Sequence, residues 1–290
     1  MPAKEDVQPY LSTLPSSKAL PQSKSPGIET VSGDIAEDRF VALSPIERQM
    51  FKVMTRSLAI PHFLYTHNAD IKLLNNLRRN FTTDLIRFSS LSESDSSISK
   101  LTLLPFIMKA VSQAFLKFPK LNSHLDTTSN SAKAQLVVKG AHNFGLAMDT
   151  PHGLLVPVVR NVQSLSVVAL AVEIQRLSRL AQEGSLGPED FKGATFTISN
   201  IGSIGGSVVS PVIVAPMVGI LAVGRVEAVP VFEVDEQGAD KVVKREQVVL
   251  SWSADHRVVD GATVARTAEV VGSLMRQAET FGLALPSAEA

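Results

Sequence analysis

Apolar positions recur along the chain with the two spacings that distinguish helices from strands. In residues 167–182 they repeat at intervals of three and four, which is typical of one face of an amphipathic helix. Gly184 suits the position just after that helix ends. By contrast, residues 248–253 alternate apolar and polar side chains, which is typical of a half-buried strand. The chain therefore mixes long helices with strands.

Residues typical of helix starts and helix ends mark the limits of four more helices. At the first of them Ser44 caps the helix, Pro45 suits the first helical position, and Glu47 completes a capping box. A helix over residues 103–118 stops before Pro119. We expect the four helices over residues 45–58, 70–80, 103–118 and 262–280.

Short runs rich in apolar and β-branched residues predict the strands. The turns Pro151-His152-Gly153 and 235–238 separate strands, and a serine-rich loop covers residues 88–100. We expect strands over residues 62–66, 134–138, 144–149, 154–159, 194–199, 212–214, 221–223 and 228–234, and one that ends at Trp252. Because the strands cluster, the pattern favours an α+β fold, a two-layer mixed β-sheet with packed helices.

The first residues differ in composition from the rest of the chain. Residues 1–43 are rich in proline, serine and charged residues without a sustained period, so we expect a flexible linker there. One folded domain is expected over residues 44–285, and a short tail over residues 286–290.

Composition narrows the classes of function. The 290 residues are 44% hydrophobic, enough for a large core, and 28 basic residues balance 28 acidic ones. Zero net charge removes the electrostatic footprint of a nucleic-acid binder, and no apolar run is long enough to span a bilayer. Without cysteine, the chain has no thiolate metal site or thiol nucleophile of its own. We expect no nucleic acid, no membrane and no metal as partners.

The strongest candidate chemistry lies between Asp255 and Gly261. His256 follows a predicted strand and precedes a predicted helix, so rigid flanks hold the imidazole while its tip stays accessible. Histidine accepts a proton near neutral pH, and Asp260 lies four positions later. A satisfied polar pair without a catalytic role fits the same spacing. If His256 is a base, it acts on the nucleophile of another molecule, because the chain has no thiol.

A second polar cluster covers residues 195–206, where a predicted strand runs into a glycine-rich bend. Alternation places Thr195, Thr197 and Ser199 on one side of the strand, and a hydroxyl at such a strand end suits a developing oxyanion. A turn with solvated hydroxyls explains the same residues. No G-x-S-x-G elbow surrounds Ser199, which argues against a nucleophilic serine.

The remaining candidates carry weaker signals. His62, His124, His142 and His152 form no metal-ligand pattern, so we expect structural or solvated roles for them. The pair Arg78-Arg79 suits phosphate groups, but it fits a solvated helix face equally well.

Four motifs follow one another along the chain. They are IPHF at residues 60–63, GLAMDT with GLLVP within residues 145–157, FTISNIG at residues 196–202 and DHRVVDG at residues 255–261. Together they resemble the catalytic domain of the dihydrolipoamide acyltransferases, the core (E2) components of the 2-oxo acid dehydrogenase complexes. Residues 60–63, 199–206 and 251–256 look most like the branched-chain member, while the pyruvate and 2-oxoglutarate members stay open. Residues 44–285 would then be the acyltransferase catalytic domain, with a fold similar to chloramphenicol acetyltransferase.

The resemblance implies an acyl-transfer mechanism. His256 is the expected general base, which takes the proton from the thiol of coenzyme A, and the thiolate attacks the thioester of S-acyl-dihydrolipoamide. Ser199 is expected to donate a hydrogen bond to the oxyanion, and Asp260 to order the histidine loop.

The resemblance also implies a set of residues that bind coenzyme A. Thr102 keeps a hydroxyl where close relatives have serine, whereas Ser178 replaces a longer amide and Met217 replaces a glutamate. The expected coenzyme A residues are Arg78, Thr102, Asp149, Ser178, Ser199, Asn200, Gly224 and Val226.

Members of this family form trimers with the active site between neighbouring chains, so His256 is expected to face Ser199 of the adjacent chain. The expected assembly is a homo-oligomer of trimers. A cubic core of twenty-four chains is favoured, and a dodecahedral core of sixty chains is the alternative. Lipoamide is expected from a lipoyl domain absent from this chain, with the E1 and E3 components as partners through regions missing here. The expected location is the mitochondrial matrix, although no transit peptide is visible in the sequence and a bacterial source stays open.

Three alternatives remain open at this point. The first is a non-catalytic scaffold of such a complex. The second is an acetyl- or succinyl-specific member of the same family. The third is an enzyme of the chloramphenicol acetyltransferase type, which moves an acyl group from coenzyme A to a hydroxyl.

Overall fold

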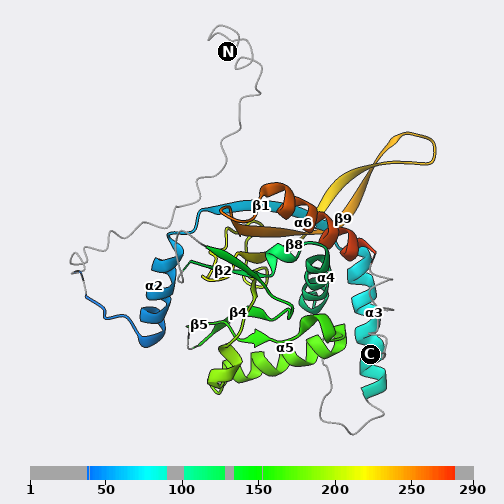
Figure 1. Cartoon of the computed structure of the whole chain (residues 1–290). Helices are drawn as coiled ribbons and strands as arrows, with labels where there is room; N and C mark the ends of the chain where they lie inside the picture. Colours follow the sequence, from blue (N-terminus) through cyan, green and yellow to red (C-terminus); the bar gives the residue numbers. More distant parts are fainter. Residues whose placement is uncertain (1–37, 39, 90–100, 128–133, 152, 278–290) are drawn as a thin grey trace, which may run out of the picture. The chain divides into compact units, whose positions relative to one another are not determined.

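The computed structural model describes residues 38, 40–89, 101–127, 134–151 and 153–277 (Figure 1). The described residues from Leu43 onward belong to one compact unit. Most of the predicted linker, most of the serine-rich loop and the whole predicted tail lie outside the described residues.

One mixed sheet organises the described chain. Its strand order is β1-β9-β8-β7-β4-β5, and β6 pairs with β4. Strands β4, β7 and β8 run parallel to one another, whereas β8, β9 and β1 are joined in antiparallel pairs. The seven strands are β1 (His62–Asp70), β4 (Phe144–Thr150), β5 (Gly153–Leu155), β6 (Val158–Val159), β7 (Phe196–Asn200), β8 (Gly219–Val234) and β9 (Asp240–Asp255).

Five α-helices accompany the sheet in the described residues. The first begins at the predicted capping box, where the Ser44 hydroxyl accepts from the Glu47 N–H and the Glu47 carboxylate accepts from the Ser44 N–H. The helices are α2 (Pro45–Ser57), α3 (Lys72–Ser89), α4 (Leu104–Lys117), α5 (Val167–Gln182) and α6 (Gly261–Arg276). A separate two-stranded sheet pairs β2 (Ser123–Asp126) with β3 (Gln135–Val138), and short 3-10 turns cover Pro119–Leu121, Val162–Ser164 and Pro188–Phe191.

The main core lies between one face of the sheet and the helices. Alternate side chains of the central strands, such as Phe144, Phe196 and Trp252, are fully buried there, together with residues of α4, α5 and α6. Phe115 of α4 meets the Phe196 ring edge to face at 4.9 Å. The opposite face of the same strands carries small and polar residues, among them Ser199, because successive side chains alternate between the two faces.

The two longest strands form a hairpin that extends from the rest of the fold (Figure 1). Strand β8 pairs with β9 from Gly219 to Val234, with an irregularity between Val223 and Val226. The turn is the one predicted at residues 235–238. None of the helices in the described part of the chain has the length and apolar character that crossing a membrane demands.

These elements confirm the predicted α+β class, a mixed sheet layered with helices, but correct several strands. Residues 221–223 and 228–234 belong to one strand, whereas residues 154–159 form two short ones. Residues 212–214 are no strand, because the Ile213 N–H donates to the His62 ring at 2.9 Å instead of to a neighbouring strand. Within residues 248–253, which the alternation predicted to be half-buried, residues 250–253 are buried on both faces of the sheet. Residues 123–126, which no predicted strand covered, form β2 and include His124.

Candidate active site

His256 occupies the junction that the sequence predicts, between the end of β9 and the start of α6. Its side chain is exposed, while its backbone N–H donates to the Pro61 carbonyl at 3.0 Å. The edge of the Phe63 ring packs against the imidazole, with ring centroids 5.0 Å apart and planes at 72°. The imidazole is therefore held from β1 and remains open to a second molecule.

Two carboxylates fix the backbone on either side of His256. Asp255 is 1% exposed and receives a bidentate ion pair from Arg257, with Nε–Oδ1 at 2.9 Å and Nη2–Oδ2 at 2.6 Å. Asp260 caps α6 by accepting from the Thr263 N–H at 2.9 Å and its hydroxyl at 2.7 Å. The Thr263 side-chain hydrogen bond is the largest cause that lowers the pKa of Asp260. Asp260 thus holds the helix start through Thr263.

Ser199 lies on the sheet face that points away from the helix layer. Its neighbours across the strands are Ala147 on β4 and Ala222 on β8, both with a side chain of one carbon. Cross-strand neighbours share a face of the sheet, so small residues flank the Ser199 hydroxyl on both sides. The half-buried hydroxyl therefore has room above it for another group.

Within one chain, His256 and Ser199 do not meet. Ser199 is level with Ala222, which is level with Ser251 on β9, and His256 lies five residues beyond Ser251. Two strand spacings and five residues of strand separate their backbones by roughly 15–20 Å. The sequence prediction that these residues act together therefore requires a second chain.

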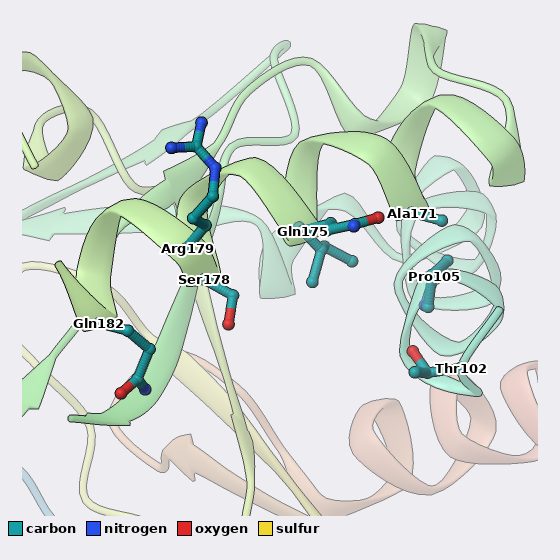
Figure 2. A pocket seen from close by; sticks show the side chains of 8 residues that line it. Thr102, Pro105, Ala171, Gln175, Ser178, Arg179 and Gln182 are labelled. Carbon is teal, nitrogen blue, oxygen red and sulfur yellow. The ribbon is translucent and has the colours of Figure 1, made fainter. Parts of the chain in front are cut away.

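A groove between the start of α4 and one side of α5 brings two of the predicted coenzyme A residues together (Figure 2). Thr102 and Ser178 line it, and Figure 2 shows Ser178 and Gln182 pointing from the same side of α5. The volume is about 390 Å³, within the range of small-molecule pockets. Gln182 donates to the Asp149 carbonyl at 3.0 Å, which attaches the end of β4 to this wall.

Amides, hydroxyls, apolar carbons and the Arg179 guanidinium share the groove lining. Thr102 and Ser178 contribute hydroxyls, Gln175 and Gln182 contribute amides, and Pro105 and Ile174 form apolar surface. A chain that alternates amide and methylene groups, as the pantetheine arm of coenzyme A does, suits such a lining.

The other predicted coenzyme A residues lie elsewhere in the fold. Arg78 of α3 donates to the Leu101 carbonyl at 3.0 Å, one residue before Thr102, and burial lowers its pKa. Asn200 ends β7, Gly224 lies within the irregularity of β8, and Val226 is the first residue after it. Gly224 also has a packing role, because a Cβ there would collide with the Ser207 carbonyl. The structure thus distributes the predicted set over α3, the groove, the end of β4 and the β7–β8 strands.

The remaining histidines make structural contacts. His62 bonds the Ile60 carbonyl and the Ile213 N–H, His124 bonds the Ala194 carbonyl, and the buried His142 bonds Ser112. His152 lies outside the described residues. Within the described part of the chain, no group of three or more histidine and carboxylate side chains gathers as a metal site.

Sequence reasoning missed two contacts of the site. The Asp255–Arg257 ion pair was not predicted, although a carboxylate and a guanidinium two positions apart in a tight loop was a usable signal. The Phe63–His256 contact had no local signal, because the pairing of β1 with β9 creates it.

Comparisons with known proteins identify the family of the chain. The model of one protein family, the 2-oxoacid dehydrogenases acyltransferase (catalytic domain), matches residues 36–283. The lipoamide acyltransferase component of the branched-chain alpha-keto acid dehydrogenase complex of Mus musculus, a mitochondrial protein, is 38% identical over 278 residues. That match covers 91% of this chain and 54% of the relative, so the chain spans about half the length of the curated relatives it matches.

Solved structures show the same relationship. The cubic core of the pyruvate dehydrogenase multienzyme complex superposes with a TM-score of 0.73 at 32% identity, covering 91% of this chain and 99% of the other. The dihydrolipoamide acetyltransferase of Azotobacter vinelandii gives the same values, and a serine, a histidine and an asparagine have been investigated in its catalytic mechanism. Since the family match covers most of the sequence, the chain belongs to the 2-oxoacid dehydrogenase acyltransferases, of which it contains the catalytic domain.

Proposed function

We propose that the chain moves an acyl group between dihydrolipoamide and coenzyme A, as the acyltransferase core of a 2-oxo acid dehydrogenase complex. The branched-chain relatives favour a branched acyl group. The observation that carries the proposal is the pair formed by an exposed imidazole on a rigid junction and a serine hydroxyl flanked by alanines.

In the proposed reaction, His256 accepts the proton of the coenzyme A thiol, whose pKa is about 8.5 in the free state. The thiolate attacks the thioester carbon, and the Ser199 hydroxyl donates a hydrogen bond to the resulting oxyanion. The carbon–sulfur bond to dihydrolipoamide then breaks, and the departing thiolate takes the proton from His256. Asp260 and the Asp255–Arg257 pair hold the loop and transfer no proton.

Each active site would form between two chains, because a single chain leaves His256 and Ser199 roughly 15–20 Å apart. The Azotobacter relative supports the assignment, since its histidine and asparagine are four positions apart, as are His256 and Asp260 here. An aspartate in place of the asparagine keeps a side chain able to cap α6.

Coenzyme A would lie along the groove of Thr102 and Ser178 and pass Asp149 toward Ser199. Arg78 would bind its phosphate groups, and Asn200, Gly224 and Val226 would complete the path on β7 and β8. The mixed amide, hydroxyl and apolar lining of the groove supports this placement.

The proposed assembly is a homo-oligomer of trimers in a cubic core, by analogy with the solved core of the pyruvate dehydrogenase complex. Residues 44–285 would be the catalytic domain, and lipoyl domains, E1 and E3 its partners. The branched-chain relatives are mitochondrial, which supports the mitochondrial matrix as the site of action.

A complementation experiment tests the proposed site. His256→Ala and Ser199→Ala are each expected to abolish acyl transfer from isobutyryl-dihydrolipoamide to coenzyme A. When the two variants are dissociated, mixed in equal amounts and reassembled, about a quarter of wild-type activity should return, because each site takes one residue from each of two chains. A mixture that stays inactive, although size measurements show mixed assemblies, would overturn the site between chains.

The acyl group is tested by comparing isobutyryl-, acetyl- and succinyl-dihydrolipoamide as donors. The branched donor is expected to give the highest kcat/KM. A higher value for acetyl or succinyl would reject branched-chain specificity, and acyl transfer to a hydroxyl acceptor alone would reject the proposed activity.

A further inference from the structure

Asn75 of α3 connects the helix to the sheet through a buried carboxamide. The residue is 5% exposed, and its Oδ1 accepts from Arg78 Nε at 3.1 Å. Its Nδ2 donates to the carboxylate of Glu246 on β9. Both ends of the amide are therefore used, and the amide can adopt only one orientation, because Arg78 offers a donor and Glu246 an acceptor.

The Arg78 guanidinium is held from two sides. Its Nε bonds Asn75, and its Nη1 donates to the Leu101 carbonyl at 3.0 Å. Two hydrogen bonds at different nitrogens fix the plane of the guanidinium, so its orientation is set before any ligand arrives.

This guanidinium does not line the groove, but it bonds the residue that precedes the groove-lining Thr102. The Leu101 carbonyl belongs to the peptide that leads into Thr102, and Thr102 lines the groove (Figure 2). The contacts of Arg78 therefore fix the position of α3 relative to the groove, which is formed by α4 and α5.

Glu246 supports the same arrangement through its main chain and its side chain. Its carbonyl accepts from the Ile71 N–H at 2.9 Å, just before α3 begins, and its carboxylate pairs with Arg79 at 3.5 Å. Neighbouring Arg79 lowers the pKa of Arg78, and the Glu246 charge opposes that effect. The negative charge of Glu246 thus offsets the repulsion between the adjacent Arg78 and Arg79.

We propose that Asn75 and Glu246 are positioning residues that aim Arg78 at the phosphate groups of coenzyme A. This inference rests on the proposed function of the site. Neither residue touches the substrate, so both act through the orientation of the Arg78 guanidinium. The consequence is selective: they affect thiol substrates that carry phosphates and leave the phosphate-free thiol pantetheine unaffected.

The test compares coenzyme A and pantetheine as acyl acceptors in Asn75→Leu and Glu246→Gln. Asn75→Leu is expected to raise KM for coenzyme A about tenfold, with kcat within about twofold and KM for pantetheine unchanged. Glu246→Gln keeps an acceptor oxygen for Asn75 and should raise KM for coenzyme A by a smaller factor. Asn76→Leu, on the exposed side of the same helix, is the matched control and should leave both values unchanged.

A double variant separates positioning from general damage. Arg78→Gln should raise KM for coenzyme A, and adding Asn75→Leu should raise it no further, because the two residues act as one unit. Additive effects, or an equal rise of KM for pantetheine, would overturn the positioning role. Wild-type protein that transfers no acyl group would instead overturn the proposed function. Active wild type with an unchanged Asn75→Leu variant would overturn this inference alone.

Discussion

The Phe63 ring stands edge-on between the His256 imidazole and the first residue of α6. Its centroid lies 5.0 Å from that of His256, and a Cβ on Gly261 would come within 2.8 Å of its tip. Strand β1, which carries Phe63, pairs with β9 so that His62 is level with Asp255. The side chain that orients the proposed base therefore comes from a strand nearly two hundred residues earlier in the sequence.

Phe63→Ala is expected to lower kcat for acyl transfer about tenfold, because the imidazole gains freedom to leave the productive orientation. KM for coenzyme A should change less than about twofold. Phe63→Leu keeps part of the bulk and should recover part of kcat. Phe191→Ala, a half-exposed phenylalanine outside the site, is the control. An equal loss of kcat in Phe63→Ala and in Phe191→Ala would contradict the role of Phe63 in orienting the His256 imidazole.

Gly202→Ala is expected to destabilise the fold by about 2 kcal/mol. A Cβ at this position would collide with the backbone carbonyl of Gly224, which no side-chain movement relieves. Because the turn after β7 follows Ser199, the variant should also lower acyl transfer. Gly140→Ala serves as control, since a Cβ there meets nothing within 4 Å. Urea denaturation measures the stability of both variants. Equal midpoints for Gly202→Ala and Gly140→Ala would contradict the close approach of Gly202 to the Gly224 carbonyl.

Local patterns predicted several features whose partners lie nearby in sequence, although the Asp255–Arg257 ion pair, two positions apart, was missed. The capping box at Ser44 and Glu47, the apolar face of α5 and the junction at His256 were all predicted from neighbouring residues. The hairpin turn at residues 235–238 was predicted for the same reason, because its chemistry is contained in the turn.

Contacts between distant segments were not predictable from these patterns. Ile213 lies in an apolar run typical of a strand, yet its N–H bonds the His62 ring, 151 positions away. Residues 248–253 alternate like a half-buried strand, but Ser251 and Ser253 are each 1% exposed. Whether a second layer covers a strand is a property of the tertiary fold, so periodicity alone could not decide it.

Lys109→Met is expected to lower the free energy of unfolding by about 2–3 kcal/mol. The buried ammonium donates to the carbonyls of Val162, Gln163 and Leu165, the last two at 2.8 and 2.7 Å. Methionine keeps the apolar stem but leaves these carbonyls without their donor. Lys117→Met, at the exposed end of the same helix, should be neutral. The comparison uses chemical denaturation of both variants, and equal stability would show that water replaces the ammonium.

Acid is expected to destabilise the fold below about pH 6.5, before the carboxylates titrate. Burial lowers the pKa of His67, His124 and His142 from the ordinary value of 6.5, and the Lys109 charge lowers that of His142 further. The unfolded chain therefore binds protons at a pH where the folded chain does not. Stability is complete above pH 6.5 and falls as the pH drops toward the lowered folded-state values.

His67 allows this pH dependence to be assigned to a residue. Its Nδ1 lies 3.5 Å from the Glu269 carboxylate, while its buried Nε2 has no partner among the described residues. Gly272 of α6 leaves the space for that nitrogen, because a Cβ there would collide with it. His67→Leu should therefore flatten the loss of melting temperature between pH 6.5 and 5, since one proton fewer separates the two states. An unchanged slope would mean that folding does not shift the pKa of His67, which the burial of its ring opposes.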